Sequence, residues 1–192
     1  SDELDLAAAG FALHPDGRVV VDAHQETSEH GVYALGDISS ASQLKHVANH
    51  EARVVAHNLA HPHRRIEADH RFVPSAVFGS PQVASVGMTE AKAKATGRKI
   101  KAGKFPFIGN GKAIALGEPE GLIKTVFDAA TGELLGAHMI GAEVTELIQG
   151  FVVAMNCETT EEELMHTVFP HPTLSEMMHE SVLDAYGRAI NM

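Results

Sequence analysis

The sequence has very little cysteine: Cys157 is the single one among 192 residues, and there is no tryptophan. One cysteine excludes a disulfide within the chain, so redox chemistry that needs a cysteine pair would have to come from outside these residues. Cys157 follows a long apolar stretch, and we expect it to be a buried small hydrophobe and not a nucleophile.

Several sequence signatures of cofactor and nucleophile sites are also missing. The chain contains no G-x-G-x-x-G, no G-x-x-x-x-G-K-[ST], no G-x-S-x-G and no C-x-x-x-x-C. These patterns build the phosphate-binding loops, the exposed serine nucleophile and the redox cysteine pair of many enzymes. The chain by itself therefore lacks the usual means of holding the pyrophosphate of a dinucleotide.

Long apolar runs and clusters of positive charge are absent as well. No apolar run approaches the roughly 20 residues that cross a bilayer, and the first residues lack the pattern of a signal peptide. Acidic residues number 25 against 15 basic ones, and no run of lysine and arginine is longer than a pair such as Arg64 and Arg65. We therefore expect a cytoplasmic protein that binds neither nucleic acid nor anionic membranes.

The chain is hydrophobic enough to fold, with 44% hydrophobic and 21% charged residues, and its length suits one domain or two small ones. In its first part, residues 11–14, 18–21 and 31–35 are predicted as strands. Apolar residues spaced by three and four predict a helix over 44–59. A proline and charges at 61–65 indicate a linker, with a boundary near residue 68.

The second part is predicted to be a mixture of strands and helices. Strands are expected at 82–86, 100–107, 122–127 and 134–140, the last two joined by a tight turn. A short helix at 91–95 would be capped by Thr89 and stopped by Gly97. The last fifty residues carry apolar stripes at helical spacing, so the fold class is α+β.

Two short segments could carry chemistry. Gly36 and Asp37 end an apolar strand ahead of a helix, which is where α/β folds bind ligand hydroxyls, although Gly-Asp after a strand is also a common turn. His171 is followed by Glu176, and a histidine held by a carboxylate can act as a general base. Thr173 and Glu176 equally fit a capping box at a helix start.

A metal site is not expected in spite of thirteen histidines. His46 and His50 are four residues apart and would share a helix face, but the sequence places no third ligand beside them. His61 and His63 lie in the expected linker, and two histidines so spaced in a linker are common on protein surfaces.

The order of these segments resembles the C-terminal part of the class I pyridine nucleotide-disulfide oxidoreductases. The resemblance rests on G-V-Y-A-L-G-D at 31–37, L-K-H-V-A at 44–48 with Glu51, P-Q-V-A-S-V-G at 81–87, G-A-H-M-I-G at 136–141 and F-P-H-P-T-L-S-E at 169–176. It implies that residues 1–68 close a Rossmann-like FAD domain with strands and one helix. Residues 69–192 would form the dimerisation domain, an antiparallel sheet with helices.

The resemblance also implies roles for individual residues. Asp37, after Gly36, would bind the ribityl chain of FAD, and the backbone at Leu44, Lys45 and His46 would face the flavin. His171 would be the base that reaches the redox thiols of the partner in a homodimer, oriented by Glu176, and the bond from His171 to Pro172 would be cis. NAD(H) or NADP(H) would be bound by a domain that has no counterpart here.

The resemblance leaves the substrate open. Met177, Met178 and the tail at 180–192 favour members that act on a dithiol such as lipoamide. Residues 43–51 are closer to mycothione or mercuric-type reductases, and glutathione is a further alternative. A different class of function also remains: a catalytically silent oligomerisation module whose apolar helices only pair with a second copy.

Overall fold

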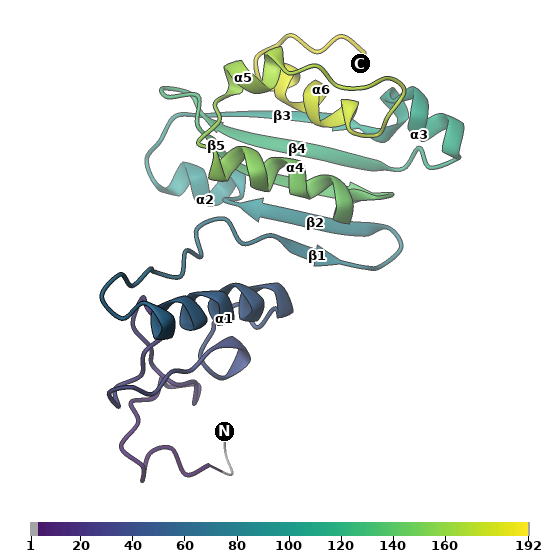
Figure 1. Cartoon of the computed structure of the whole chain (residues 1–192). Helices are drawn as coiled ribbons and strands as arrows, with labels where there is room; N and C mark the ends of the chain where they lie inside the picture. The colour runs from purple at the N-terminus through teal and green to yellow at the C-terminus, as the bar shows by residue number, and fades with distance from the viewer. Residues whose placement is uncertain (1–3, 192) are drawn as a thin grey trace. The chain divides into compact units, whose positions relative to one another are not determined.

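The computed structural model describes residues 4–191. The chain divides into two compact units, and the division falls between His70 and Arg71. Figure 1 shows the elements of both units, which are described separately below. No helix among the described residues is both long enough and apolar enough to cross a bilayer.

Over residues 4–70 the first unit contains two helical elements, the 3-10 helix η1 (Gly36–Ile38) and the helix α1 (Lys45–Ala60). The helix confirms the prediction from apolar spacing, and its inner face buries Val47, Val54 and Val55 together with the polar residues Glu51 and Asn58. Burial of these valines against the rest of the unit is its main apolar stabilisation.

The strands predicted in the first unit are wrong. Residues 11–14, 18–21 and 31–35 take part only in isolated bridges, which pair Leu13 with Val19, Val21 with Thr27 and Glu26 with Tyr33. Side chains occupy backbone donors in these segments: Ser28 Oγ accepts from Ala12 N, Asp16 from Arg18 N and Glu26 from Gly31 N. Such local hydrogen bonds compete with a strand ladder, so the segment forms turns instead.

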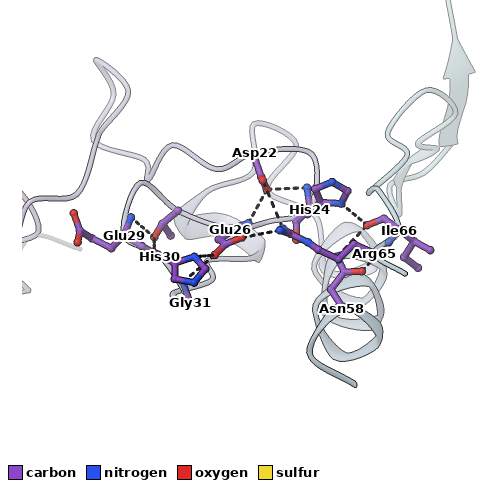
Figure 2. A network of polar contacts seen from close by, with 10 residues as sticks. Asp22, His24, Glu26, Glu29, His30, Gly31, Asn58, Arg65 and Ile66 are labelled. Carbon is purple, nitrogen blue, oxygen red and sulfur yellow. Dashed lines mark hydrogen bonds and ion pairs between the residues drawn. The ribbon is translucent and has the colours of Figure 1, made fainter. Parts of the chain in front are cut away.

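Residues 61–65, expected as a linker, belong to the first unit. Arg65 pairs with Glu26 at 2.9 Å, and Asn58 holds both backbone groups of Ile66, at 2.8 Å and 3.0 Å (Figure 2). His24 Nδ1 lies 2.9 Å from the same Ile66 carbonyl oxygen. This polar network fastens the segment after α1 to the turns before it, so the division between the units falls further along the chain.

The second unit is built on one antiparallel sheet of five strands. They are β1 (Ser75–Val77), β2 (Gln82–Gly87), β3 (Ile100–Pro106), β4 (Gly121–Asp128) and β5 (Leu134–Gly141), in the order β1-β2-β5-β4-β3. All four pairings are antiparallel. The predicted hairpin is confirmed as β4 and β5, while the short edge strand β1 was not predicted.

Five helices and one 3-10 turn complete this unit: α2 (Glu90–Ala95), η2 (Phe107–Gly109), α3 (Gly111–Leu116), α4 (Val144–Asn156), α5 (Glu161–His166) and α6 (Glu176–Ala185). The predicted cap of α2 is confirmed, since Thr89 Oγ1 accepts from Lys92 N at 3.2 Å. Gly97 follows that helix with φ +81°, as a helix stop requires. The mixture of helices and antiparallel strands confirms the α+β class.

The core of the second unit lies between the sheet and two helices. Helix α4 packs on β2 and β5, and α6 packs on β3 and β4, on the same face of the sheet (Figure 1). Fully buried side chains fill the layer: Phe105, Phe107, Phe127, Phe151 and Met177. Cys157, expected to be buried, is exposed because it lies beyond the last turn of α4, outside the apolar stripe.

Candidate functional site

The candidate acid/base pair lies at the start of α6. His171 Nδ1 is 3.0 Å from Glu176 Oε1, and Thr173 N donates to Glu176 Oε2 at 2.8 Å. The His171 side chain is 79% exposed, against 28% for Glu176. The structure therefore brings both predicted alternatives together, because one carboxylate orients the imidazole and also accepts from the loop backbone.

The capping box predicted here is present only in part. Glu176 accepts from Thr173 N as a box requires, but the Thr173 hydroxyl donates to the carbonyl of Pro170 at 2.7 Å. Helix α6 begins at Glu176 itself, with Ser175 as its N-cap. The peptide bond between His171 and Pro172 is cis, as the family resemblance implied.

Electrostatics keep Glu176 ionised beside the imidazole. Burial raises the pKa of Glu176, but the hydrogen bonds from Thr173 N and His171 outweigh burial and hold that pKa below its usual range. A carboxylate beside Nδ1 favours a proton on that nitrogen and leaves Nε2 as the basic atom. Among the described residues His171 Nε2 has no hydrogen-bond partner, so it can accept a proton from a molecule that docks against it.

Gly36 and Asp37 lie in η1 and not at the end of a strand. Gly36 has φ +72°, and a Cβ on it would lie 3.1 Å from the Cβ of Ala48, so only glycine lets this turn approach α1 so closely. The Asp37 side chain next to it is exposed. Asp37 can therefore accept hydrogen bonds from hydroxyl groups of a ligand.

The N-terminus of α1 is open to an anionic group. Its N-cap, Leu44, provides no capping side chain, and the first turn contains no acidic residue. Lys45 and His46, the first two helical residues, are exposed, while Leu44 is half-buried. The positive end of the dipole of this 16-residue helix is thus not neutralised by its own side chains.

Glu51, a residue of α1, is hydrogen-bonded to the turn that contains Gly36 and Asp37, and no role was predicted for it from the sequence. Its side chain is 1% exposed, and Oε2 accepts from Gly36 N at 2.6 Å while Oε1 lies 2.9 Å from His70 Nε2. A charged residue on the apolar face of a predicted helix is the signal that could have identified it. The structure thus joins Gly36 and Asp37 to α1, whereas His171 and Glu176 belong to the second unit.

A metal centre is not formed by the residues in the described part of the chain. Within 4–191, no three histidine, cysteine, aspartate or glutamate side chains lie close enough to hold an ion. His46 and His50 are therefore not joined there by a third ligand.

Comparisons with known proteins give a consistent result. The family model described as the pyridine nucleotide-disulphide oxidoreductase dimerisation domain matches residues 73–182, and the model described as pyridine nucleotide-disulphide oxidoreductase matches residues 1–52. The dihydrolipoyl dehydrogenase of Rhizobium etli is 59% identical over 190 residues, which cover 99% of this chain and 39% of that protein. The dihydrolipoyl dehydrogenase of Zymomonas mobilis is 53% identical over 190 residues, covering 99% of this chain and 41% of that protein.

A solved structure shows the same fold. The HOCl-induced flavoprotein disulfide reductase RclA from Escherichia coli aligns with a TM-score of 0.85 at 26% identity, over 93% of this chain and 41% of RclA. The chain thus spans about two fifths of the length of the curated relatives that it matches. With the dimerisation-domain model covering residues 73–182, the chain belongs to the pyridine nucleotide-disulphide oxidoreductase family, as its sequence motifs indicated.

Proposed function

We propose that this chain is the C-terminal part of a dihydrolipoyl dehydrogenase-like flavoenzyme that moves electrons between NAD(H) and a dithiol such as lipoamide. Residues 1–68 would close the FAD domain and residues 69–192 would form the dimerisation domain of a cytoplasmic homodimer. The observation that carries the proposal is the exposed His171 imidazole, whose Nδ1 is held 3.0 Å from Glu176.

His171 would act as the general acid and base. In the direction of dithiol oxidation, Nε2 takes the proton of a substrate S–H, and the thiolate that forms attacks a disulfide sulfur of the partner subunit. The positive charge that develops on the imidazole is stabilised by Glu176, which remains a carboxylate throughout. In the reverse direction the same nitrogen returns the proton to the leaving sulfur.

The first unit would supply part of the FAD site. Asp37 would offer a carboxylate to the ribityl hydroxyls, and the backbone at Leu44, Lys45 and His46 would offer the positive end of α1 to the flavin. Gly36 keeps this turn against α1. FAD, when bound, would carry the electrons between the dithiol and the nicotinamide, which the other parts of the enzyme would bind.

Exposed apolar side chains support the dimer. Val168, three residues before His171, is 92% exposed, and Phe78, next to the edge strand β1, is 80% exposed. Large apolar side chains in water cost free energy and are typical of surfaces that pair with another chain. A second copy that covers Val168 would also approach the face on which His171 lies.

A chimera tests this function directly. The matching part of the Rhizobium etli dihydrolipoyl dehydrogenase is replaced by this chain, and NAD+ reduction by dihydrolipoamide is measured. His171→Gln should lower kcat by about 100- to 10,000-fold, the range lost with a general base. His63→Gln, at an exposed histidine of the first unit, is the matched control and should leave turnover unchanged.

If the chain is instead a catalytically silent oligomerisation module, the same experiment should give the opposite result. In that case the chimera assembles into a dimer, but His171→Gln leaves kcat as high as His63→Gln does. Equal turnover of the two variants would therefore overturn the acid/base role while leaving the family membership untouched.

A further inference from the structure

We propose that Asn110 is a positioning residue that holds the loop carrying His171 in place. The loop, residues 170–175, is the last part of the segment between α5, which ends at His166, and α6, which begins at Glu176. The effect of Asn110 on turnover rests on the function proposed above for His171, whereas its effect on the geometry of the loop does not.

Asn110 joins two segments that are far apart in the chain. Its Nδ2 donates to the carbonyl oxygen of Thr173 at 3.1 Å, and its Oδ1 accepts from Ala113 N at 2.9 Å. Asn110 is 6% exposed, so water does not readily replace either bond. Thr173 is thereby held at both of its backbone groups, by Asn110 at its carbonyl and by Glu176 at its N–H.

The chemistry of this position requires a short amide. The Thr173 carbonyl needs a donor and the Ala113 N–H needs an acceptor, and only one orientation of the Asn110 amide satisfies both. A serine could still cap α3 but has no second group to reach Thr173. An aspartate would cap α3 well but would direct a negative oxygen at the Thr173 carbonyl.

Asn110 is itself anchored to the sheet. Its N–H donates to the carbonyl of Phe107 at 2.9 Å, and the Phe107 ring is fully buried. The ring occupies the space that side chains would fill on Gly121 and Gly141: a Cβ on either would lie 2.6 Å from a ring carbon. These two glycines face each other in neighbouring strands, so Phe107 fixes Asn110 relative to β4 and β5.

A second and independent anchor holds the other end of the loop. Helix α6, which begins at Glu176, is bonded to the sheet through Thr125 Oγ1, which donates to the Ser181 carbonyl at 2.9 Å. This anchor holds the middle of α6 on the sheet, but it does not contact the loop residues before Glu176. Leu174 of the loop is buried in the core, and Asn110 adds the polar contact that fixes the Thr173 backbone, and with it the His171 side of the pair, against the Glu176 carboxylate.

Titration of the Glu176 carboxyl group in this chain tests the positioning without any assay of activity. The carboxyl carbons of glutamate are labelled with carbon-13, and Glu176→Gln identifies the signal by its loss. Because Thr173 N and His171 lower the pKa of Glu176, displacement of the loop should raise that pKa. Asn110→Ser, which keeps the cap of α3, is the test variant, and Asn110→Asp is the second.

Thr89→Ala is the matched control, since it removes the cap of α2, a helix of six residues like α3, without touching the loop. We expect the pKa of Glu176 to rise in Asn110→Ser and Asn110→Asp and to stay unchanged in Thr89→Ala. An unchanged titration in both Asn110 variants, or an equal rise in Thr89→Ala, would overturn the proposal. If Asn110→Ser does not fold, Asn110→Thr takes its place, because threonine also caps a helix and, unlike aspartate, adds no charge that would itself raise the pKa of Glu176.

Kinetics in the chimera separate this proposal from the proposed function. A misplaced base loses efficiency steeply, so Asn110→Ser should lower kcat/KM by about 10- to 100-fold, with Thr89→Ala near the parent. A raised Glu176 pKa without any loss of turnover would support the positioning and contradict the catalytic role of His171. Loss of turnover without a change in the Glu176 titration would contradict the positioning.

Discussion

Gly103 of β3 lies so close to Ser181 of α6 that a side chain on Gly103 would overlap the Ser181 carbonyl oxygen. The close approach brings the backbone of α6 onto the sheet, where Thr125 Oγ1 donates to Ser181 and Asp184 accepts from Lys104 N at 2.7 Å. Helix α6, which begins at Glu176, is therefore held against the sheet by close packing and by hydrogen bonds, and both restrict its movement.

A side chain at position 103 should push α6 away from the sheet and so destabilise the second unit. Gly103→Ala should lower the free energy of unfolding of this unit by about 1–3 kcal/mol, because overpacking a filled interface forces the backbone apart. Gly111→Ala is the control, since nothing lies within 4 Å of a Cβ there. Urea denaturation followed by circular dichroism gives both values, and equal stability of the two variants would contradict the close packing of α6.

Glu90 should make the stability of the second unit depend on pH. Hydrogen bonds from Lys124 and Lys94 lower the pKa of Glu90 from its usual 4.5 to about 2. Because the pKa is lower in the folded chain, the ion pairs stabilise the fold fully above the usual value, and this stabilisation is lost as the pH falls towards 2. Glu90→Gln should therefore be less stable than the parent at neutral pH.

Urea denaturation at several pH values checks the sign of this effect. The difference between the parent and Glu90→Gln should shrink as the pH falls from about 7 to about 2. Glu118→Gln makes the same change of charge at an exposed residue and should follow the parent at every pH. A difference for Glu90→Gln that does not vary with pH would contradict the role of the two lysines.

Glu51 should stabilise the turn that contains Gly36 and Asp37. In Glu51→Ala the Gly36 N–H loses its acceptor at a buried position, which costs about 1–3 kcal/mol. Glu51→Gln retains one carbonyl oxygen that can accept from Gly36, so its effect should be smaller. Exchange of the Gly36 amide with deuterium should be fastest in Glu51→Ala, and equal exchange in both variants and in the parent would contradict this contact.

Glu176→Gln in the chimera should reduce activity less than His171→Gln does. An amide can accept one of the two bonds that the carboxylate accepts, but it directs an N–H group at the other donor. Loss of the partner that orients a metal-bound histidine typically costs about 10- to 100-fold, and we expect a loss of the same order here. Turnover equal to that of the parent would show that His171 does not depend on Glu176 for its orientation.

The sequence predicts best those elements whose signals are local. The hairpin of β4 and β5 has turn residues between two apolar strands, and α1 has apolar residues at helical spacing, so both were predicted. At 170–175 the spacing of Thr173 and Glu176 fits a capping box, while His171 and Glu176 also fit an oriented general base, so the sequence leaves both interpretations open. A complete capping box forms instead at Thr160 and Glu163, at the start of α5. The sequence there shows the same spacing of threonine and glutamate as at Thr173 and Glu176, so spacing alone does not distinguish the two sites.

The parts that could not be predicted depend on contacts between distant residues. Asn110 and Thr173 are 63 residues apart, and an asparagine before a short helix indicates only a cap. The role of Glu51 depends on Gly36, which lies outside its helix. The strands predicted in the first unit do not form because the side chains of Asp16, Ser28 and Glu26 take backbone donors that a ladder would need.

The central claim is that His171 serves the thiols of the partner subunit, and complementation between two inactive chimeras tests it most directly. One chimera carries His171→Gln, and the other keeps His171 but has serines in place of the redox cysteines contributed by the Rhizobium etli part. After subunit exchange at equal amounts, random pairing predicts that about a quarter of the parent activity returns, because half of the dimers then contain one complete site. Absence of any recovery, with mixed dimers shown to form, would contradict a base that acts across the interface.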